Sequence, residues 1–188
     1  IGPRGEDQCT GCLIADADPN TTIDYFYTAN HCLANQATAE DAEFHWLYQT
    51  ASCNGAPPNL ASVPRTVGAD FLAGLIAGPG TDTSLVRLRQ APPAGVTYVG
   101  WSTARLGLDE ELAIVHHPQG AHKHISFGKL SSWWANFYQV RWHSGATELG
   151  SSGGPLFNSS QKLIGQLRGG TAACGRPEGI DNLGRFDV

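Results

Sequence analysis

The stretch AEFHWLYQ, residues 42–49, places an aromatic side chain at every second position: Phe44, Trp46 and Tyr48. This alternation is typical of a β-strand that buries one face. Further segments have strand character: TIDYFYTA (22–29), TSLVRL (83–88), VTYVGWS (96–102), ELAIVHH (111–117), HKHISFGKL (122–130) and FYQVRW (137–142), with LFNSSQKLIGQL (156–167) as a hairpin. No long segment has helical periodicity, and one helical turn is expected near residues 29–34. The patterns predict an all-β protein.

Composition narrows the classes of protein that fit. The 188 residues carry a formal net charge of −5, which gives no basic surface for nucleic acid, and no apolar run is long enough to span a membrane. Five cysteines in a chain with few charges favour an oxidising compartment and hence secretion. The segment RQAPPAGV (89–96) is the densest proline stretch without strand character, and it is the best place to divide the chain into two units.

The stretch ELGSSGGPLF, residues 148–157, carries the first chemical signal. It sets two serines, Ser151 and Ser152, among three glycines. A serine hydroxyl becomes a nucleophile only beside a general base, which is usually a histidine held by a carboxylate. Glycines allow the backbone to present N–H groups to a developing oxyanion. The loop is therefore a candidate for nucleophilic catalysis, whereas its default interpretation is an ordinary turn.

Two other segments provide the partners that such a serine needs. In YFYTANHCL, His31 follows an aromatic strand and precedes Cys32, and in GTDTSLVRL, Asp82 precedes an apolar strand. Asp70 is the alternative carboxylate. The order His31, Asp82, Ser152, with TAxHC, DxxLVxL and GxSGGP around them, resembles the trypsin-like serine proteases of the chymotrypsin fold.

The resemblance assigns roles to residues of the loop. The nucleophile precedes the second glycine of the motif, which selects Ser152, and the oxyanion donors are the N–H groups of Gly150 and Ser152. Ser151 lies where animal trypsins have an aspartate that pairs with a freed N-terminus. Because this chain has no carboxylate there, the amino group of Ile1 would have no negative charge to pair with. We therefore expect activation by N-terminal insertion to be absent.

IVHHPQGAHKHIS (114–126), GSSGGPLF, LIGQLRGG and DNLGRF resemble more closely the bacterial lysyl endopeptidase group, over nearly the whole chain. This resemblance implies two six-stranded antiparallel Greek-key barrels with the active site between them. Residues 1–92 would form the N-terminal barrel with His31 and Asp82. Residues 93–188 would form the C-terminal barrel with Ser152 and the specificity pocket.

The same resemblance implies a pocket for the substrate's P1 side chain. Asp181 would lie at its base and select a cationic group, and Gly169 and Gly170 would line it. A surface turn aspartate is the competing interpretation of Asp181. Arg168 replaces a histidine that stacks on a tryptophan in the lysyl enzymes, for which Trp133 and Trp134 are candidates here. The expected specificity is therefore for Lys or Arg rather than for Lys alone.

The resemblance also predicts a disulfide between Cys9 and Cys32, beside the general base. A bridge between Cys12 and Cys53 is a second possibility, which leaves Cys174 without a partner. His116, His117, His122 and His124 have a spacing that fits no closed zinc site, so we expect no metal and no cofactor.

Taken together, the sequence predicts a secreted, monomeric serine endopeptidase that acts on proteins or peptides after Lys or Arg, and that binds neither nucleic acid nor membrane. Two alternatives stay open. One is a catalytically silent binding protein on the same fold, and the other is a protease with a different P1 specificity, such as a glutamyl endopeptidase.

Overall fold

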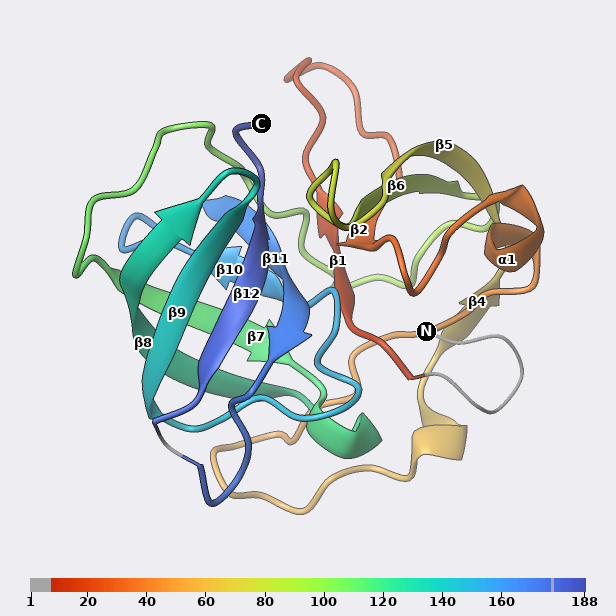
Figure 1. Cartoon of the computed structure of the whole chain (residues 1–188). Helices are drawn as coiled ribbons and strands as arrows, with labels where there is room; N and C mark the ends of the chain where they lie inside the picture. Colours follow the sequence, from red (N-terminus) through yellow and green to blue (C-terminus); the bar gives the residue numbers. More distant parts are fainter. Residues whose placement is uncertain (1–7, 177) are drawn as a thin grey trace.

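The computed structural model describes residues 8–176 and 178–188, and its regular secondary structure is almost entirely β-strand (Figure 1). Besides a short helix α1 (Gln36–Glu40) and two 3-10 turns (Leu60–Ser62 and Pro118–Gly120), the elements are β1 (Gly11–Ile14), β2 (Tyr25–Ala29), β3 (Glu43–His45), β4 (Arg65–Val67), β5 (Ala69–Leu75), β6 (Thr83–Leu88), β7 (Glu111–His116), β8 (His124–Trp134), β9 (Phe137–Ser144), β10 (Pro155–Phe157), β11 (Leu163–Gly170) and β12 (Ile180–Arg185). The predicted all-β class is confirmed.

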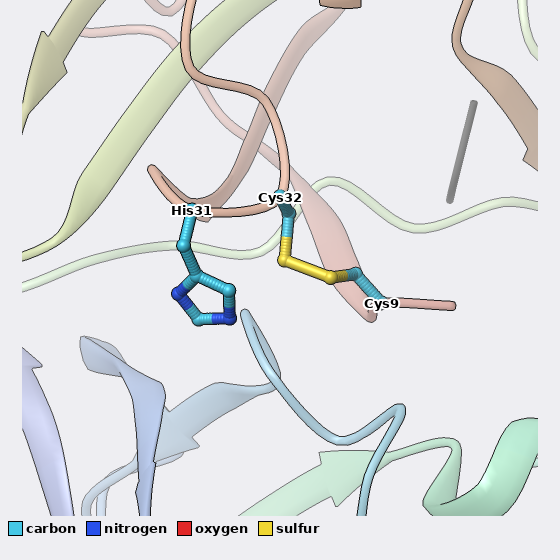
Figure 2. A group of neighbouring side chains, drawn as sticks. All are labelled: Cys9, His31 and Cys32. Atoms are coloured by element: carbon cyan, nitrogen blue, oxygen red, sulfur yellow. A yellow bond between two sulfur atoms is a disulfide. The ribbon is translucent and has the colours of Figure 1, made fainter. Parts of the chain in front are cut away.

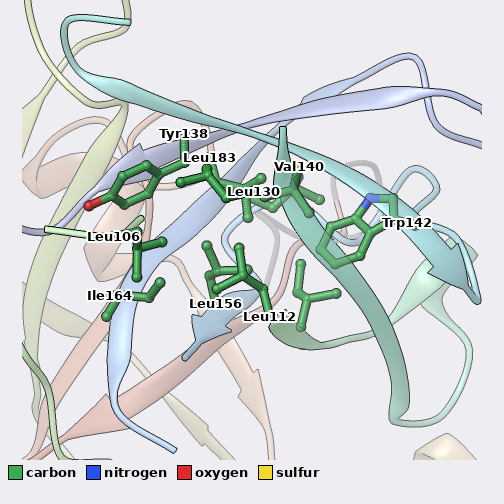
Figure 3. Packing of buried hydrophobic residues seen from close by; sticks show 11 residues of the cluster. Leu106, Leu112, Leu130, Tyr138, Val140, Trp142, Leu156, Ile164 and Leu183 are labelled. Carbon is green, nitrogen blue, oxygen red and sulfur yellow. The ribbon is translucent and has the colours of Figure 1, made fainter. Parts of the chain in front are cut away.

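The six strands β7–β12 form a closed antiparallel barrel in the order β10-β11-β12-β9-β8-β7. Alternate residues point inward, as Leu112 and Ile114 do on β7. They pack with Leu130, Val140 and other apolar side chains into one core (Figure 3). The predicted six-stranded barrel is therefore present in the C-terminal half, and burial of this core supplies its main stabilisation.

The N-terminal half also has six strands, but the structure does not close them into the predicted barrel. A four-stranded sheet has the order β1-β2-β6-β5, and β3 pairs only with β4. The strands β3 and β4 have three residues each, and Pro64 just before β4 has no N–H to extend a ladder. Both sheets nevertheless share one core, in which Phe26, Phe44 and Val86 are buried.

The two halves meet through a smaller apolar cluster. Ile14 of β1 and Tyr27 of β2 pack against Leu163 of β11. The segment 96–102, predicted to be a strand, runs between them and forms two isolated bridges, Val99 with Ile14 and Trp101 with Leu163. This segment pairs first with the N-terminal half and then with the C-terminal half, so it forms no continuous β-ladder with either. The domain boundary at residues 92 and 93 stays a prediction.

Within the described residues, no helix has the length and apolar character needed to cross a membrane.

Candidate active site

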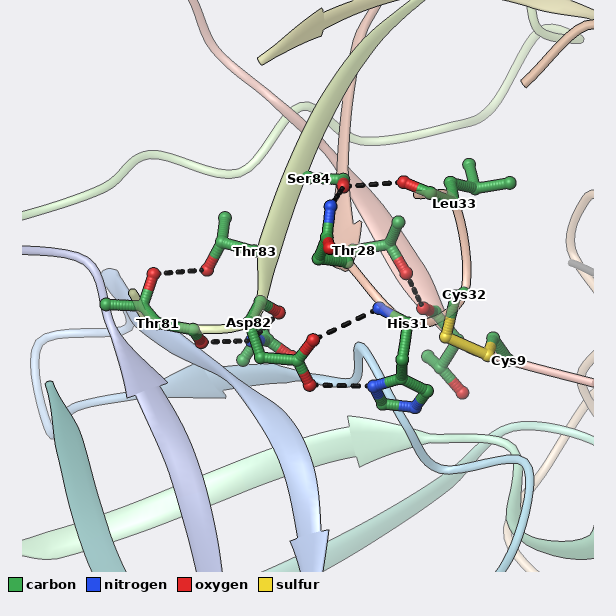
Figure 4. A network of polar contacts seen from close by, with 12 residues as sticks. Cys9, Thr28, His31, Cys32, Leu33, Thr81, Asp82, Thr83 and Ser84 are labelled. Atoms are coloured by element: carbon green, nitrogen blue, oxygen red, sulfur yellow. Dashed lines mark hydrogen bonds and ion pairs between the residues drawn. A yellow bond between two sulfur atoms is a disulfide. The ribbon is translucent and has the colours of Figure 1, made fainter. Parts of the chain in front are cut away.

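His31 and Asp82 lie at the ends of neighbouring strands. His31 follows β2, and Asp82 directly precedes β6, to which β2 is paired. The Nδ1 atom of His31 is 2.7 Å from Oδ2 of Asp82, and the backbone N–H of His31 donates to Oδ1 over 3.1 Å (Figure 4). Asp82 is 2% exposed, whereas the His31 side chain is 45% exposed. The carboxylate therefore holds the Nδ1 edge of the imidazole ring, and much of the rest of the ring is exposed.

The backbone around Asp82 is held from both halves of the molecule. Its carbonyl oxygen accepts from the N–H of Asn30 (2.9 Å) and from Nε2 of Gln166 on β11 (2.7 Å). These bonds hold Asp82 at a φ of +57°, which is unusual for a residue other than glycine. The alternative carboxylate, Asp70, lies at the surface and bonds to Arg87 and Arg89 instead.

The serine loop packs against the strand that leads to His31. The N–H of Thr10 donates to the carbonyl oxygen of Ser152 over 2.7 Å. A Cβ atom at Gly153 would lie only 2.2 Å from Thr28 Oγ1 and 2.9 Å from the nitrogen of Ala29, so only glycine fits this approach. In Figures 2 and 4 the blue loop before β10 comes close to the His31 ring. Ser152 itself is half-buried.

Gly150 occupies the other end of the same loop in a backbone conformation that favours glycine, with φ at +89°. Its carbonyl oxygen accepts from the hydroxyl of Thr10 over 2.8 Å. Thr10 therefore binds the backbone at both Gly150 and Ser152, a role that the sequence interpretation missed. The only sequence signal for it is its position directly after Cys9.

Five of the predicted residues line one open depression of about 430 Å³: His31, Asp82, Arg168, Gly169 and Gly170. Ala77 and Asn182 complete the lining. The structure thus brings together residues from the turn after β2, from the segment just before β6 and from β11, which are far apart in the chain.

Asp181 lies on β12 next to this depression and is fully buried. Its Oδ2 accepts from Nε1 of Trp142 (2.7 Å) and from the hydroxyl of Thr147, and its Oδ1 accepts from the N–H of Ala172 (3.3 Å). The interpretation of Asp181 as a surface turn residue is therefore wrong. A Cβ atom at Gly170 would lie 2.4 Å from Asp181 Oδ1, so only glycine allows β11 to lie this close to the carboxylate.

The ring beneath Arg168 is that of Phe137, and the expectation of Trp133 or Trp134 is wrong. Cζ of Arg168 lies 5.6 Å from the Phe137 centroid. Cζ of Arg105 instead lies 5.0 Å from the ring centroid of Trp133. Trp134 packs on Phe137 with a centroid distance of 5.3 Å. Successive residues on β8 point to opposite faces, which sends the two tryptophans to different partners.

The disulfide between Cys9 and Cys32 is present, as predicted, with Cα atoms 6.2 Å apart (Figure 2). The suggested Cys12–Cys53 bridge is wrong, because both are free thiols, as is Cys174. Among the described residues, the one group with metal-ligand spacing is Cys9, His31 and Cys32. Both sulfur atoms are bonded to each other, so this group offers no thiolate to a cation.

The histidines after β7 serve as hydrogen-bonding and packing residues. Nδ1 of His117 donates to the carbonyl oxygen of Ala121 (2.9 Å), and its ring stacks on Tyr48. His122 packs on His124, with centroids 4.7 Å apart. Burial lowers the pKa of His117 to about 4 and also lowers the pKa of His124.

This fold is shared with solved structures of proteases. The structure resembles two solved structures of the Mycobacterium tuberculosis protease Rv3671c in its inactive form, one of them a serine-to-alanine mutant. The TM-scores are 0.57 and, for the mutant, 0.56, with 16% and 14% identity. The matches cover 95% of this chain in both cases, and 78% and 76% of the other chains.

Within that class, residues 2–184 match the model of the lysyl endopeptidase C-terminal domain. The chain therefore belongs to this family of proteases. It is 34% identical over 182 residues to the lysyl endopeptidase of Pseudomonas aeruginosa, covering 90% of this chain and 38% of the relative. It is 25% identical to the secreted RxLR effector protein 73 of Plasmopara viticola, covering 83% and 39%. The chain thus spans under two-fifths of the length of either relative.

Proposed function

We propose that this chain is the catalytic part of a secreted serine endopeptidase that cleaves peptide bonds after Lys or Arg. The observation that carries the proposal is the His31–Asp82 pair, with a 2.7 Å Nδ1–Oδ2 contact, beside a glycine-rich serine loop. Membership of the lysyl endopeptidase family supports it.

In the proposed reaction, Ser152 Oγ bonds to the carbonyl carbon of the substrate as its proton passes to Nε2 of His31. Asp82 holds the Nδ1–H tautomer and stabilises the imidazolium that forms. His31 then gives the proton to the leaving amine, the peptide C–N bond breaks, and a water molecule hydrolyses the acyl-enzyme. The N–H groups of Gly150 and Ser152 would stabilise the oxyanion in both steps.

A cationic P1 side chain is supported by the chemistry of Asp181. The carboxylate accepts three hydrogen bonds, but hydrogen-bond donors do not cancel its buried charge. A Lys or Arg side chain that enters beside Gly169 and Gly170 would bring the missing positive charge. An acidic P1 group would be repelled, which argues against a glutamyl endopeptidase.

Arg168 adds a permanent positive charge to the same depression. Stacked on Phe137, it is expected to disfavour a cation that passes close to it. For this reason we propose specificity for Lys or Arg without strict selection of Lys. The Cys9–Cys32 disulfide supports an oxidising location and hence secretion.

The proposal is tested by peptide-library cleavage read by mass spectrometry, together with labelling by a fluorophosphonate probe. We expect cleavage after Lys and Arg, labelling of Ser152, and a loss of turnover of roughly 10⁶-fold in Ser152→Ala. Ser160→Ala, in an exposed turn, is the matched control and should keep full activity. Absence of both labelling and cleavage would favour the silent binding protein, and cleavage after Glu would favour the glutamyl alternative.

A further inference from the structure

His116, the last residue of β7, is fully buried, and the proposed reaction does not use it. Both of its ring nitrogens contact serine hydroxyls. Nδ1 is 2.7 Å from Oγ of Ser151, and Nε2 is 3.1 Å from Oγ of Ser126. Ser151 is also fully buried and directly precedes the proposed nucleophile. Buried polar groups are normally hydrogen-bonded, and His116 meets this requirement entirely through two hydroxyl groups, one of them beside the proposed nucleophile.

The neighbouring contacts define where the protons lie. The hydroxyl of Ser126 can direct its single proton towards the carbonyl oxygen of Ala146, 3.5 Å away, and its Oγ can then accept from Nε2 of His116 at 3.1 Å. Oγ of Ser151 accepts from the N–H of Glu148 over 3.1 Å. The Ser151 hydroxyl then donates its own proton to Nδ1 of His116. The opposite tautomer would leave the buried Ser151 hydroxyl proton without an acceptor, which is costly.

Both ends of this chain of hydrogen bonds are attached to the segment 146–151. It begins at the N–H of Glu148 and ends at the carbonyl oxygen of Ala146. Directly after Glu148, the carbonyl oxygen of Leu149 accepts from the N–H of Gln119 over 2.5 Å. Because the peptide unit is planar and trans, fixing this carbonyl also fixes the opposite direction of the Gly150 N–H. That N–H is one of the two proposed oxyanion donors.

We propose that His116, in its neutral Nε2–H tautomer, is a positioning residue that orders the oxyanion segment through Ser151. This inference rests on the proposed function. The contact joins a neutral imidazole to a hydroxyl, so ordering the segment requires no buried ion. Protonation of His116 would present an Nδ1–H to a hydroxyl that already accepts from Glu148, and would deprive the Ser151 proton of its acceptor.

The surroundings of His116 keep the ring neutral. Burial lowers its pKa to about 4, and His124 and His117 act in the same direction through their own positive charges. The ring centroids of His116 and His124 are 6.4 Å apart. The segment is therefore expected to stay ordered throughout the range in which His31 must act as a base.

Nitrogen NMR of ¹⁵N-histidine-labelled protein tests the tautomer without any reference to activity. We expect one imidazole in the neutral Nε2–H form from pH 7.5 down to pH 5, and its signals should disappear in His116→Asn. The proposal would be overturned if the signals lost in His116→Asn belong to an Nδ1–H tautomer, or to a ring that titrates with the ordinary histidine midpoint. Absence of hydrolysis by the parent protein would count against the proposed function alone.

Two variants test the positioning role. In His116→Asn, the amide oxygen can take the place of Nδ1 and accept from Ser151, whereas His116→Leu removes both polar contacts. We expect kcat per titrated active site to fall about 100-fold in the leucine variant with KM nearly unchanged, and the asparagine variant to recover most of this loss. Equal kcat per active site in parent and leucine variant would refute the positioning role. If the leucine variant does not fold, Ser151→Ala and its rescue by Ser151→Thr provide the same comparison.

Discussion

Gln166 of β11 donates from Nε2 to the carbonyl oxygen of Asp82 across 2.7 Å, and so connects the barrel to the residue that orients His31. The same nitrogen lies 3.1 Å from the carbonyl oxygen of Thr81. Residues of both halves thus hold the proposed His31–Asp82 pair, although His31 and Asp82 themselves come from the N-terminal half alone.

Replacing Gln166 by Leu should therefore lower both stability and activity. Two buried carbonyl oxygens would lose a donor, at a cost of about 1–3 kcal/mol in the free energy of unfolding. We also expect kcat to fall, because Asp82 would be less firmly held in its left-handed conformation. Urea unfolding and ester hydrolysis measure the two effects. The control Gln90→Leu removes only an exposed hydrogen bond from the N–H of Val67, so it should lower stability much less and leave kcat unchanged. An unaltered Gln166→Leu protein would contradict the prediction.

Asp181→Asn should reduce selectivity for cationic P1 groups. Its amide retains the shape of the carboxylate but not its charge, and its NH₂ group meets the donors Trp142 and Thr147. We expect the ratio of kcat/KM for Lys over Leu substrates to fall by at least tenfold, with some loss of stability. Asp109→Asn is the matched control, because that residue is exposed and asparagine tolerates its φ of +62°. Full selectivity in Asp181→Asn would remove Asp181 from the proposed pocket.

Replacing both Cys9 and Cys32 by Ala should lower the free energy of unfolding by roughly 3 kcal/mol, the value expected for a loop of this length. The disulfide also ties Thr10 and the serine loop to the turn that carries His31, so kcat should decrease as well. Denaturant titrations without reductant measure the first effect. Cys53→Ala, which removes an exposed free thiol, is the control and should behave like the parent.

Stability should decrease as the pH falls from about 6.5 towards 4. The pKa of His116 is lowered to about 4 in the folded protein, chiefly by burial. Between these values the unfolded chain takes up a proton that the folded protein does not, so the free energy of unfolding falls with falling pH. The expected loss is about 2–3 kcal/mol for this residue. Urea titrations at pH 7.5 and 4.5 measure this loss of unfolding free energy. If His116→Asn loses as much between the two pH values as the parent does, the loss does not come from His116.

The acidic groups do not confuse this measurement. The hydrogen bond from Arg185 lowers the pKa of Asp187, and the hydrogen bond from Arg89 lowers the pKa of Asp70. A carboxyl group with a lowered pKa begins to destabilise the fold only below about pH 5. The interval from 6.5 to 5 therefore reports mainly on buried histidines, and at pH 4.5 such carboxyl groups, including Glu40 and Glu111, add only a small part of the loss.

Much of the fold could be predicted because strands bury alternate residues, and this pattern is local. Residues 22–29, 83–88, 111–117, 122–130, 137–142 and 156–167 all contain strands or a hairpin where the sequence predicts them. The missed strands β1, β4, β5 and β12 are short or contain glycine, which weakens the pattern. The open N-terminal half could not be predicted, since pairing between distant strands leaves no local signal.

The candidate site divides in the same way. The sequence by itself determined the all-β class, the motifs around His31, Asp82 and Ser152, and, through resemblance, the Cys9–Cys32 bridge. Only the tertiary structure decided that Phe137 lies under Arg168, that Asp181 is buried and hydrogen-bonded, and that Thr10 and His116 hold the serine loop. A hydrogen bond between residues many positions apart depends on atoms placed within about 3 Å of each other, and no local pattern encodes that distance.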